Sequence, residues 1–143
     1  MTIPDANVLI HAVNDQVRQH RIAKDWLEKA LAGTQPVGMT WAAMLAFVRI
    51  TTRPGLWPQP MSVDRAFAVL DAWLAAPTVE IIHPGAEHSH NVKRLLDSAG
   101  TAGNLVPDAH LAALAIEHGA ELVTFDRDFG RFAGLRWKLL PGA

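Results

Sequence analysis

Aspartates follow short apolar runs at three widely separated places in the chain. The runs are TIP before Asp5, NLVP before Asp108, and ELVTF before Asp126 and Asp128. Ligands of open α/β sheets bind beyond the carboxyl ends of the strands, so side chains that follow different strands can meet there. Two unit charges about 4 Å apart repel by roughly 4 kcal/mol at an effective dielectric constant of about 20. Converging carboxylates therefore need a cation, and the pattern predicts a metal site.

Each aspartate also has a simpler interpretation. Asp5 and Asp108 stand where helices are expected to begin, so either side chain could be a helix cap. Asp126 and Asp128 could form only an Asx-type turn. The conjunction of all four, not any one of them, favours the metal site.

Other chemistries have weaker support. The seven histidines could supply zinc ligands, but no pair shows the helical i, i+4 spacing with a neighbouring glutamate. The chain has no GxGxxG or GxxxxGK phosphate loop and no GxSxG nucleophile elbow. It also has no cysteine. Any metal must therefore be held by oxygen or imidazole.

The elements that must position the aspartates alternate between short apolar runs and helical periodicity. This alternation predicts a parallel sheet with helices on both faces. We expect the side chain of Trp41 to be buried in the core. The expected strands are 2–4, 36–39, 78–83, 121–125 and a short fifth one in 137–141; the expected helices are 6–13, 18–32, 40–51, 62–74, 86–99 and 108–118.

Composition sets the broad class of protein. A chain of 143 residues suits one domain, and 50% apolar with 19% charged residues is typical of a globular protein. No segment reads as a membrane span or a secretory signal, so we expect a cytoplasmic protein without a membrane partner. The net charge of −1 does not point to nucleic acid. However, residues 33–62 contain no acid and include Arg49 and Arg53.

Two segments, DANVLIHAV and VPDAHLAALAIEHGAELVTFDRDFGRF, carry a family resemblance. They look like the PIN domain of VapC toxins, the ribonuclease half of bacterial VapBC toxin–antitoxin systems. The resemblance spans essentially the whole chain, and the later segment is the specific part. It implies one PIN domain over residues 1–143, built as a three-layer α/β/α sandwich around a parallel sheet of four or five strands. It also implies a Mg²⁺ or Mn²⁺ ion at the acids.

The resemblance assigns roles to individual residues. The implied metal ligands are Asp5, Asp108 and Asp126, and these three together with Asp128, an auxiliary acid, are the implied catalytic residues. Asn7 matches a residue that supports the first aspartate, Thr124 matches a hydroxyl that precedes Asp126, and both are expected substrate contacts.

At one position the chain departs from the family pattern. Most members carry a glutamate on the third helix, three residues before an arginine. Here Arg49 is present and the matching residue is Ala46. Mg²⁺ can be held by one or two carboxylates together with water and substrate phosphate, so one tightly held ion is expected. The alternative is a non-catalytic PIN domain that binds RNA or an antitoxin without cutting.

The implied function is that of a type II toxin, a metal-dependent endoribonuclease that hydrolyses RNA phosphodiester bonds. Arg49 and Arg53 could bind RNA phosphates, and Trp57 could stack on an unpaired base. The implied partners are a VapB-like antitoxin and a second copy of the chain. A phosphatase-like hydrolase with Asp5 as nucleophile is a third interpretation, but it would want an aspartate where Asn7 stands.

Overall fold

A parallel sheet forms the middle layer of the protein. The computed structural model covers residues 1–143 and describes all of them except residues 56–58. The five strands lie in the order β3-β2-β1-β4-β5, and all neighbours are parallel. The strands are β1 (Thr2–Pro4), β2 (Val37–Met39), β3 (Val79–Ile81), β4 (Glu121–Thr124) and β5 (Trp137–Leu139).

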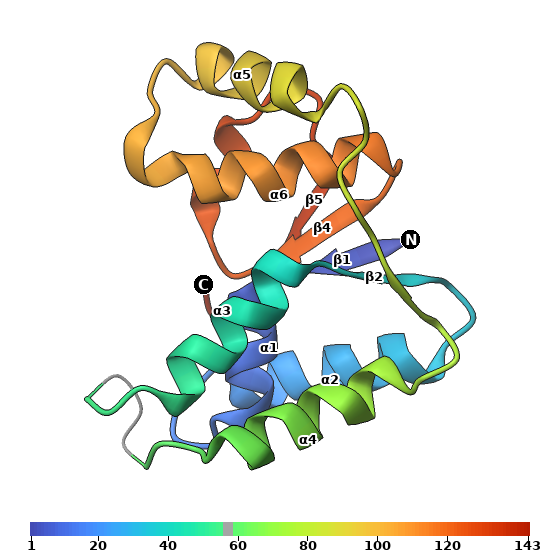
Figure 1. Cartoon of the computed structure of the whole chain (residues 1–143), viewed down its shortest axis with the longest axis vertical. Helices are drawn as coiled ribbons and strands as arrows, with labels where there is room; N and C mark the ends of the chain where they lie inside the picture. Colours follow the sequence, from blue (N-terminus) through green and yellow to red (C-terminus); the bar gives the residue numbers. More distant parts are fainter. Residues whose placement is uncertain (56–58) are drawn as a thin grey trace.

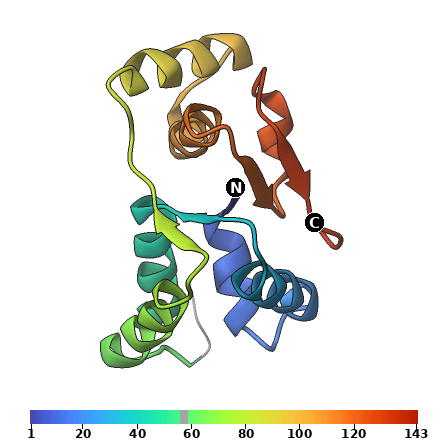
Figure 2. The same cartoon turned by 90° about the vertical axis from the view of Figure 1, so that its right-hand side faces the viewer.

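Helices cover both faces of this sheet (Figures 1 and 2). One face carries α1 (Ala6–Val13), α2 (His20–Ala32), α3 (Trp41–Thr52) and α4 (Val63–Leu74). The other carries α5 (His88–Ala99) and α6 (Val106–Glu117). Two short 3₁₀ helices follow α5 and β4: η1 (Gly103–Leu105) and η2 (Arg127–Arg131). The predicted α/β/α sandwich is confirmed.

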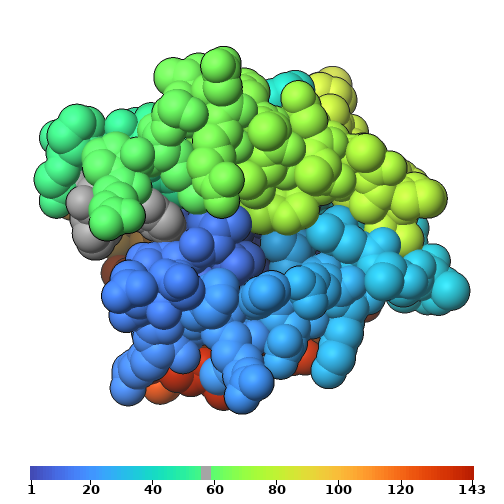
Figure 3. Space-filling view, turned by 90° about the horizontal axis from the view of Figure 1, so that it is seen from below, coloured from blue at the N-terminus to red at the C-terminus, as the bar shows by residue number. Residues whose placement is uncertain are grey.

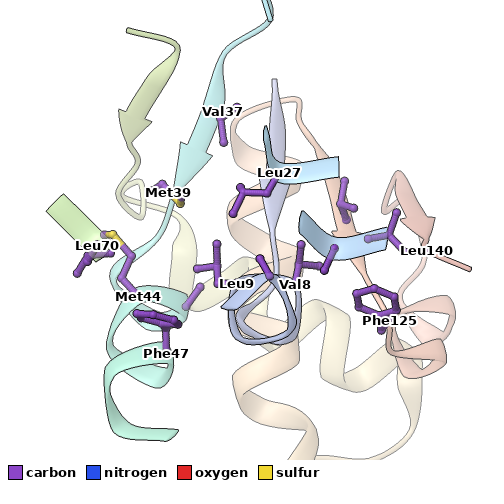
Figure 4. Close-up of a cluster of buried hydrophobic side chains, with 14 residues drawn as sticks. Val8, Leu9, Leu27, Val37, Met39, Met44, Phe47, Leu70, Phe125 and Leu140 are labelled. Carbon is purple, nitrogen blue, oxygen red and sulfur yellow. The ribbon is translucent and has the colours of Figure 1, made fainter. Parts of the chain in front are cut away.

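The alternation of side chains along the strands divides the core in two. Val37, Met39 and Val123 face the layer of α1 to α4, where they join the cluster shown in Figure 4. Ile3 and Leu122 face α5 and α6. A strand therefore places successive residues on opposite faces of the sheet, as its twofold period requires.

The outer surface of the first layer is made by α1, α2 and α4. Figure 3 shows α1 with α2 and the α4 segment on neighbouring parts of this surface.

Among the described residues, no helix combines the length and apolarity needed to cross a membrane.

Side-chain caps stand at the beginning of three helices, each of which starts within one residue of its predicted position. Asp5, Thr40 and Ser62 accept hydrogen bonds from the first turns of α1, α3 and α4. The predicted start of α6 is wrong by two residues. This helix begins at Val106, because Pro107 is tolerated in a first turn, where its missing N–H has no helical partner. Asp108 consequently lies inside the first turn of α6 and does not cap it.

The expected burial of Trp41 is also wrong. Its side chain is 43% exposed, whereas Ala43, Met44 and Phe47 form the buried stripe of α3. Trp41 lies to one side of that stripe, so the apolar character of the residue did not predict which way its side chain points.

Candidate metal and nuclease site

The carboxyl ends of the two central strands β1 and β4 form the floor of the site. The backbone N–H of Asp5 donates to the carbonyl of Val123 at 2.9 Å, which extends the strand pairing by one residue. The Asp5 side chain then turns toward α1, where Oδ1 accepts from the N–H of Ala6 at 2.7 Å. Its other oxygen, Oδ2, accepts from the hydroxyl of Thr124 at 2.7 Å. Asp5 is therefore held at both oxygens.

Thr124 connects the two strand ends. Its fully buried hydroxyl donates to Asp5 and accepts from Asn7 Nδ2 at 3.2 Å and from the backbone N–H of Asp126 at 3.0 Å. A hydroxyl has one hydrogen and two lone pairs, so its hydrogen-bonding capacity is filled. Asn7 completes the network, because its Oδ1 accepts from the N–H of Phe125 at 3.3 Å. Through these hydrogen bonds Asn7 and Thr124 tie the carboxylate of Asp5 to the backbone at Phe125 and Asp126.

Three of the four predicted acids come together. One carboxylate oxygen from each of Asp108, Asp126 and Asp128 lies within 4.8 Å of the others. Asp126 and Asp128 belong to the turn after β4, where Asp126 Oδ1 accepts from the N–H of Asp128 at 2.8 Å and caps η2. Asp108 reaches the same place from the first turn of α6. We call these three residues the acid group.

Electrostatic coupling links Asp5 to the acid group. Burial raises the pKa of Asp5; the hydrogen bonds from Thr124 and Ala6 oppose this effect, and the charge of Asp126 adds to it. Burial, followed by the charges of Asp5, Asp126 and Asp128, raises the pKa of Asp108 to about 6. No residue in the described part of the chain donates a hydrogen bond to the Asp108 carboxylate. The site therefore has an excess of negative charge that a cation would neutralise.

The donor set fits a hard divalent ion. Three carboxylates supply only oxygen ligands, which suit Mg²⁺ or Mn²⁺, and the exposure of Asp128 leaves room for coordinated water. Among the described residues, no histidine belongs to a group with metal-ligand spacing. A larger cavity of about 640 Å³, between residues 13–16 and 59–65, includes none of the four acids.

The other predicted substrate contacts are less well placed. Arg49 lies in the last turn of α3, and Arg53 directly follows that helix. Neither lines the cavity beside the acid group. Trp57 falls outside the described residues. Ala46, at the position of the expected glutamate, is on α3, and no described residue of α3 joins the acid group.

Sequence reasoning missed two sets of residues, one beside the acids and one at the far end of α6. Arg131 and Asn104 line a cavity together with Asp108 and Asp128. Arg131 belongs to the segment that carries the family resemblance, so its charge so close to the aspartates was an available signal. Glu117 and His88 form a second polar cluster at the far end of α6, where their side chains lie 2.7 Å apart. Because His88 and Glu117 are 29 residues apart in sequence, no local pattern predicted that they would pair.

The class of protein follows from a family model. The PIN domain model matches residues 2–135, nearly the whole chain. The chain is therefore a PIN domain. Its architecture is an α/β/α sandwich with a parallel sheet, and the aspartates gather at the carboxyl edge of that sheet.

Similar proteins narrow the family further. Ribonuclease VapC37 of Mycobacterium tuberculosis is 47% identical over 99% of this chain and 98% of its own length. Ribonuclease VapC33 of the same species is 39% identical, with 96% of each chain covered. The chain belongs to the VapC ribonucleases of the PIN-domain family.

Solved structures agree with this fold at lower sequence identity. The VapBC2 complex of Rickettsia felis, bound to a promoter DNA fragment, gives a TM-score of 0.70 at 19% identity, over 97% of this chain and 98% of that one. The VapC20 toxin of M. tuberculosis, which cleaves the sarcin–ricin loop, gives 0.68 at 17% identity, over 95% and 99%.

Proposed function

We propose that this VapC ribonuclease is the toxin of a VapBC pair and hydrolyses RNA phosphodiester bonds with a Mg²⁺ or Mn²⁺ ion held at the acid group. The observation that carries the proposal is the convergence of Asp108, Asp126 and Asp128 within 4.8 Å, with a pKa of about 6 for Asp108. Such crowding is unfavourable unless a cation is bound.

The residues divide the work by their hydrogen bonds. Asp108 is assigned as a direct ligand because no described donor occupies its oxygens. Asp126 has Oδ1 engaged by the N–H of Asp128, which leaves Oδ2 for the ion or for a proton of the attacking water. The Thr124 hydroxyl keeps both Asp5 and Asp126 in place. Held by these residues, a divalent ion would neutralise charge at the phosphate and would make the attacking water more acidic.

Asp5 and Asp128 are the two candidates for the third metal ligand. The family resemblance names Asp5, and the spacing of oxygens favours Asp128. Titration of Mn²⁺ into D5N and D128N variants distinguishes the two, because removal of a direct ligand should weaken binding far more than removal of a neighbour. We expect both variants to bind Mn²⁺ more weakly, with D108N the weakest of all. The D97N variant is the control, since Asp97 is an exposed α5 residue paired with Lys93.

Cleavage of RNA tests the activity itself. Purified protein should cut RNA in the presence of Mg²⁺, stop in EDTA, and lose activity in D5A and D108A variants but keep it in D97N. Unchanged Mg²⁺-dependent cleavage by D5A and D108A would mean that the site is assigned wrongly.

A second candidate function is supported by Ala46. Without the glutamate usual in the family, the domain could bind RNA or an antitoxin without cutting. RNA binding by the wild type in Mg²⁺, with no cleavage, would favour this alternative.

The proposed partner is a small VapB-like antitoxin, and the proposed assembly includes a homodimer. Structures similar in fold include VapBC complexes from R. felis and Haemophilus influenzae. Co-expression with the product of a small reading frame found next to its gene, followed by size-exclusion chromatography with light scattering, tests both expectations. Absence of a complex would remove the antitoxin assignment.

A further inference from the structure

A cavity of about 360 Å³ adjoins the acid group. Asp108 and Asp128 line it, and Arg131 of η2 lines it with them. Thr101, which follows α5, and Asn104 of η1 complete the polar lining. This volume lies in the range of sites that hold small molecules. The cavity therefore offers space for part of a substrate directly beside the atoms assigned to catalysis.

Arg131 is the cation of this cavity. The described residues contain three salt bridges, and Arg131 takes part in none of them, although two carboxylates line the same cavity. A phosphodiester that approaches three carboxylates meets repulsion, and a guanidinium offset from those carboxylates can bind the phosphate with two parallel hydrogen bonds. Arg131 thus has the charge, the position and the free donors for that role.

The helix that carries Arg131 is firmly anchored. Phe129 and Phe132 flank Arg131, are buried in the core below α6, and contact each other with ring centroids 6.0 Å apart. Between them, Gly130 lies against Trp137, where an added Cβ would come within 3.0 Å of the indole ring. The backbone of η2 is therefore fixed, and the exposed Arg131 projects from a defined point.

The lining of the cavity also indicates which part of a nucleotide it would contact. None of the described residues that line it is aromatic, so it lacks the platform on which a base stacks. Thr101 and Asn104 offer a hydroxyl and an amide, and both residues are exposed. These groups suit the oxygens of ribose and phosphate.

We propose that this cavity is the subsite for the nucleotide next to the scissile phosphate, with Arg131 binding its phosphate and Asn104 hydrogen-bonding to its ribose. The inference rests on the proposed function, because it takes RNA as the substrate of the acid group. It adds a substrate-binding residue and a substrate subsite that lie outside the metal ligands.

The test compares two arginines of the same 3₁₀ helix. Arg127 is exposed, begins η2 and does not line the cavity, so R127A removes an equal charge from the same short helix. Binding of a fluorescein-labelled, mixed-sequence RNA of ten nucleotides is measured by anisotropy with the D108N variant as background, and cleavage of the same RNA is measured with Asp108 intact.

We expect R131A to raise the KM for RNA by about tenfold or more, with a smaller change in kcat, whereas R127A stays within about twofold. R131K should recover part of the loss, because a lysine restores the charge but not the bidentate geometry. The slope of log Kd against log salt concentration should fall by about 0.7 in R131A, as expected for one lost contact to a single strand. N104A should raise the KM by less than R131A does.

The outcomes separate this inference from the proposed function. Equal effects of R131A and R127A on an active enzyme would overturn the inference and leave the function standing. An inactive wild type whose RNA binding still depends on Arg131 would overturn cleavage and keep the subsite. A protein that neither binds nor cuts RNA would overturn both. Mn²⁺ affinity unchanged in R131A would exclude damage to the acid group as the cause.

Discussion

The two ends of α6 carry carboxylates in opposite situations. Asp108, in the first turn, faces Asp126 and Asp128, and its pKa is raised to about 6 by burial and by the neighbouring acids. Glu117, the last residue, accepts hydrogen bonds from the N–H of Gly85 at 2.9 Å, from His88 Nδ1 at 2.7 Å and from Asn91 Nδ2 at 3.1 Å. Burial raises the pKa of Glu117, but these hydrogen bonds outweigh it and the pKa is lowered.

The helix dipole would predict the reverse of both shifts. A carboxylate is stabilised at the N-terminus of a helix and destabilised at the C-terminus, by about 0.3–1 kcal/mol. Here local partners decide, because the hydrogen bonds to Glu117 and the charges around Asp108 act at shorter range. One helix thus presents a carboxylate whose acceptors are filled and a carboxylate left without described donors. The first holds the fold together, and the second is available to a cation.

The first prediction separates activity from stability at Asp108. We expect D108N to lower RNA cleavage by about 100-fold or more, as removal of a group that stabilises transition-state charge does. In EDTA the same variant should melt at a slightly higher temperature than the wild type, because the amide removes one of the mutually repelling charges. Initial rates and thermal unfolding measure the two effects. A variant that is less stable but cleaves RNA normally per folded molecule would place Asp108 in the same structural role as Glu117.

The second prediction concerns the other end of α6. We expect E117A to destabilise the protein by about 2–3 kcal/mol, because three donors lose their acceptor in a largely buried place. The melting temperature should fall by roughly 5–10 °C for a chain of this size. Cleavage per folded molecule and Mn²⁺ affinity should stay within about twofold. E87A, which changes an exposed glutamate at the start of α5, is the control; an equal loss in both variants would reduce the Glu117 cluster to a surface contact.

The pH dependence of stability should distinguish the two carboxylates. Without metal, the folded protein retains the Asp108 proton up to about pH 6, whereas the unfolded chain releases it near the ordinary value of 3.8. Folding therefore binds a proton in this window, and stability contributed by Asp108 at low pH is lost as the pH rises from about 4 to 6. For Glu117, whose pKa is lowered, stability is instead lost as the pH falls through the folded value.

Denaturant titrations at several pH values measure this effect. In EDTA, the stability of D108N relative to the wild type should increase between pH 4 and 6 and then level off. Mg²⁺ should reduce the difference, because a bound cation removes the repulsion. A difference that does not change with pH would contradict the raised pKa of Asp108.

Most of the fold could be predicted because its signals are local. The apolar runs of the strands, the helical periodicity and the capping hydrogen bonds of Asp5, Thr40 and Ser62 each act within a few residues. The structure confirms these elements within about two residues at most boundaries. Local signals failed at Trp41, whose exposure depends on how α3 is rotated against the sheet.

The site was predictable in part for the same reason. Strand order brings the ends of β1 and β4 together, so the approach of Asp5 to Thr124 follows from a parallel sheet. The choice between Asp5 and Asp128 as third ligand depends on differences of a few ångströms that sequence does not encode locally. The Glu117 cluster joins segments 26 or more residues apart and required the packing of α5 on α6.

The smallest expected effect comes from restoring the glutamate that most of the family carries. A46E should change Mn²⁺ affinity and RNA cleavage by no more than about threefold, because the acid group already offers three carboxylates and Mg²⁺ can be held by one or two. The added charge should nevertheless increase the repulsion among the carboxylates around Asp108 when no metal is bound. In EDTA, A46E should be less stable than A46Q, and Mg²⁺ should remove the difference. A gain in affinity well beyond threefold would mean instead that the acid group lacks a ligand, and that Ala46 limits what this site can hold.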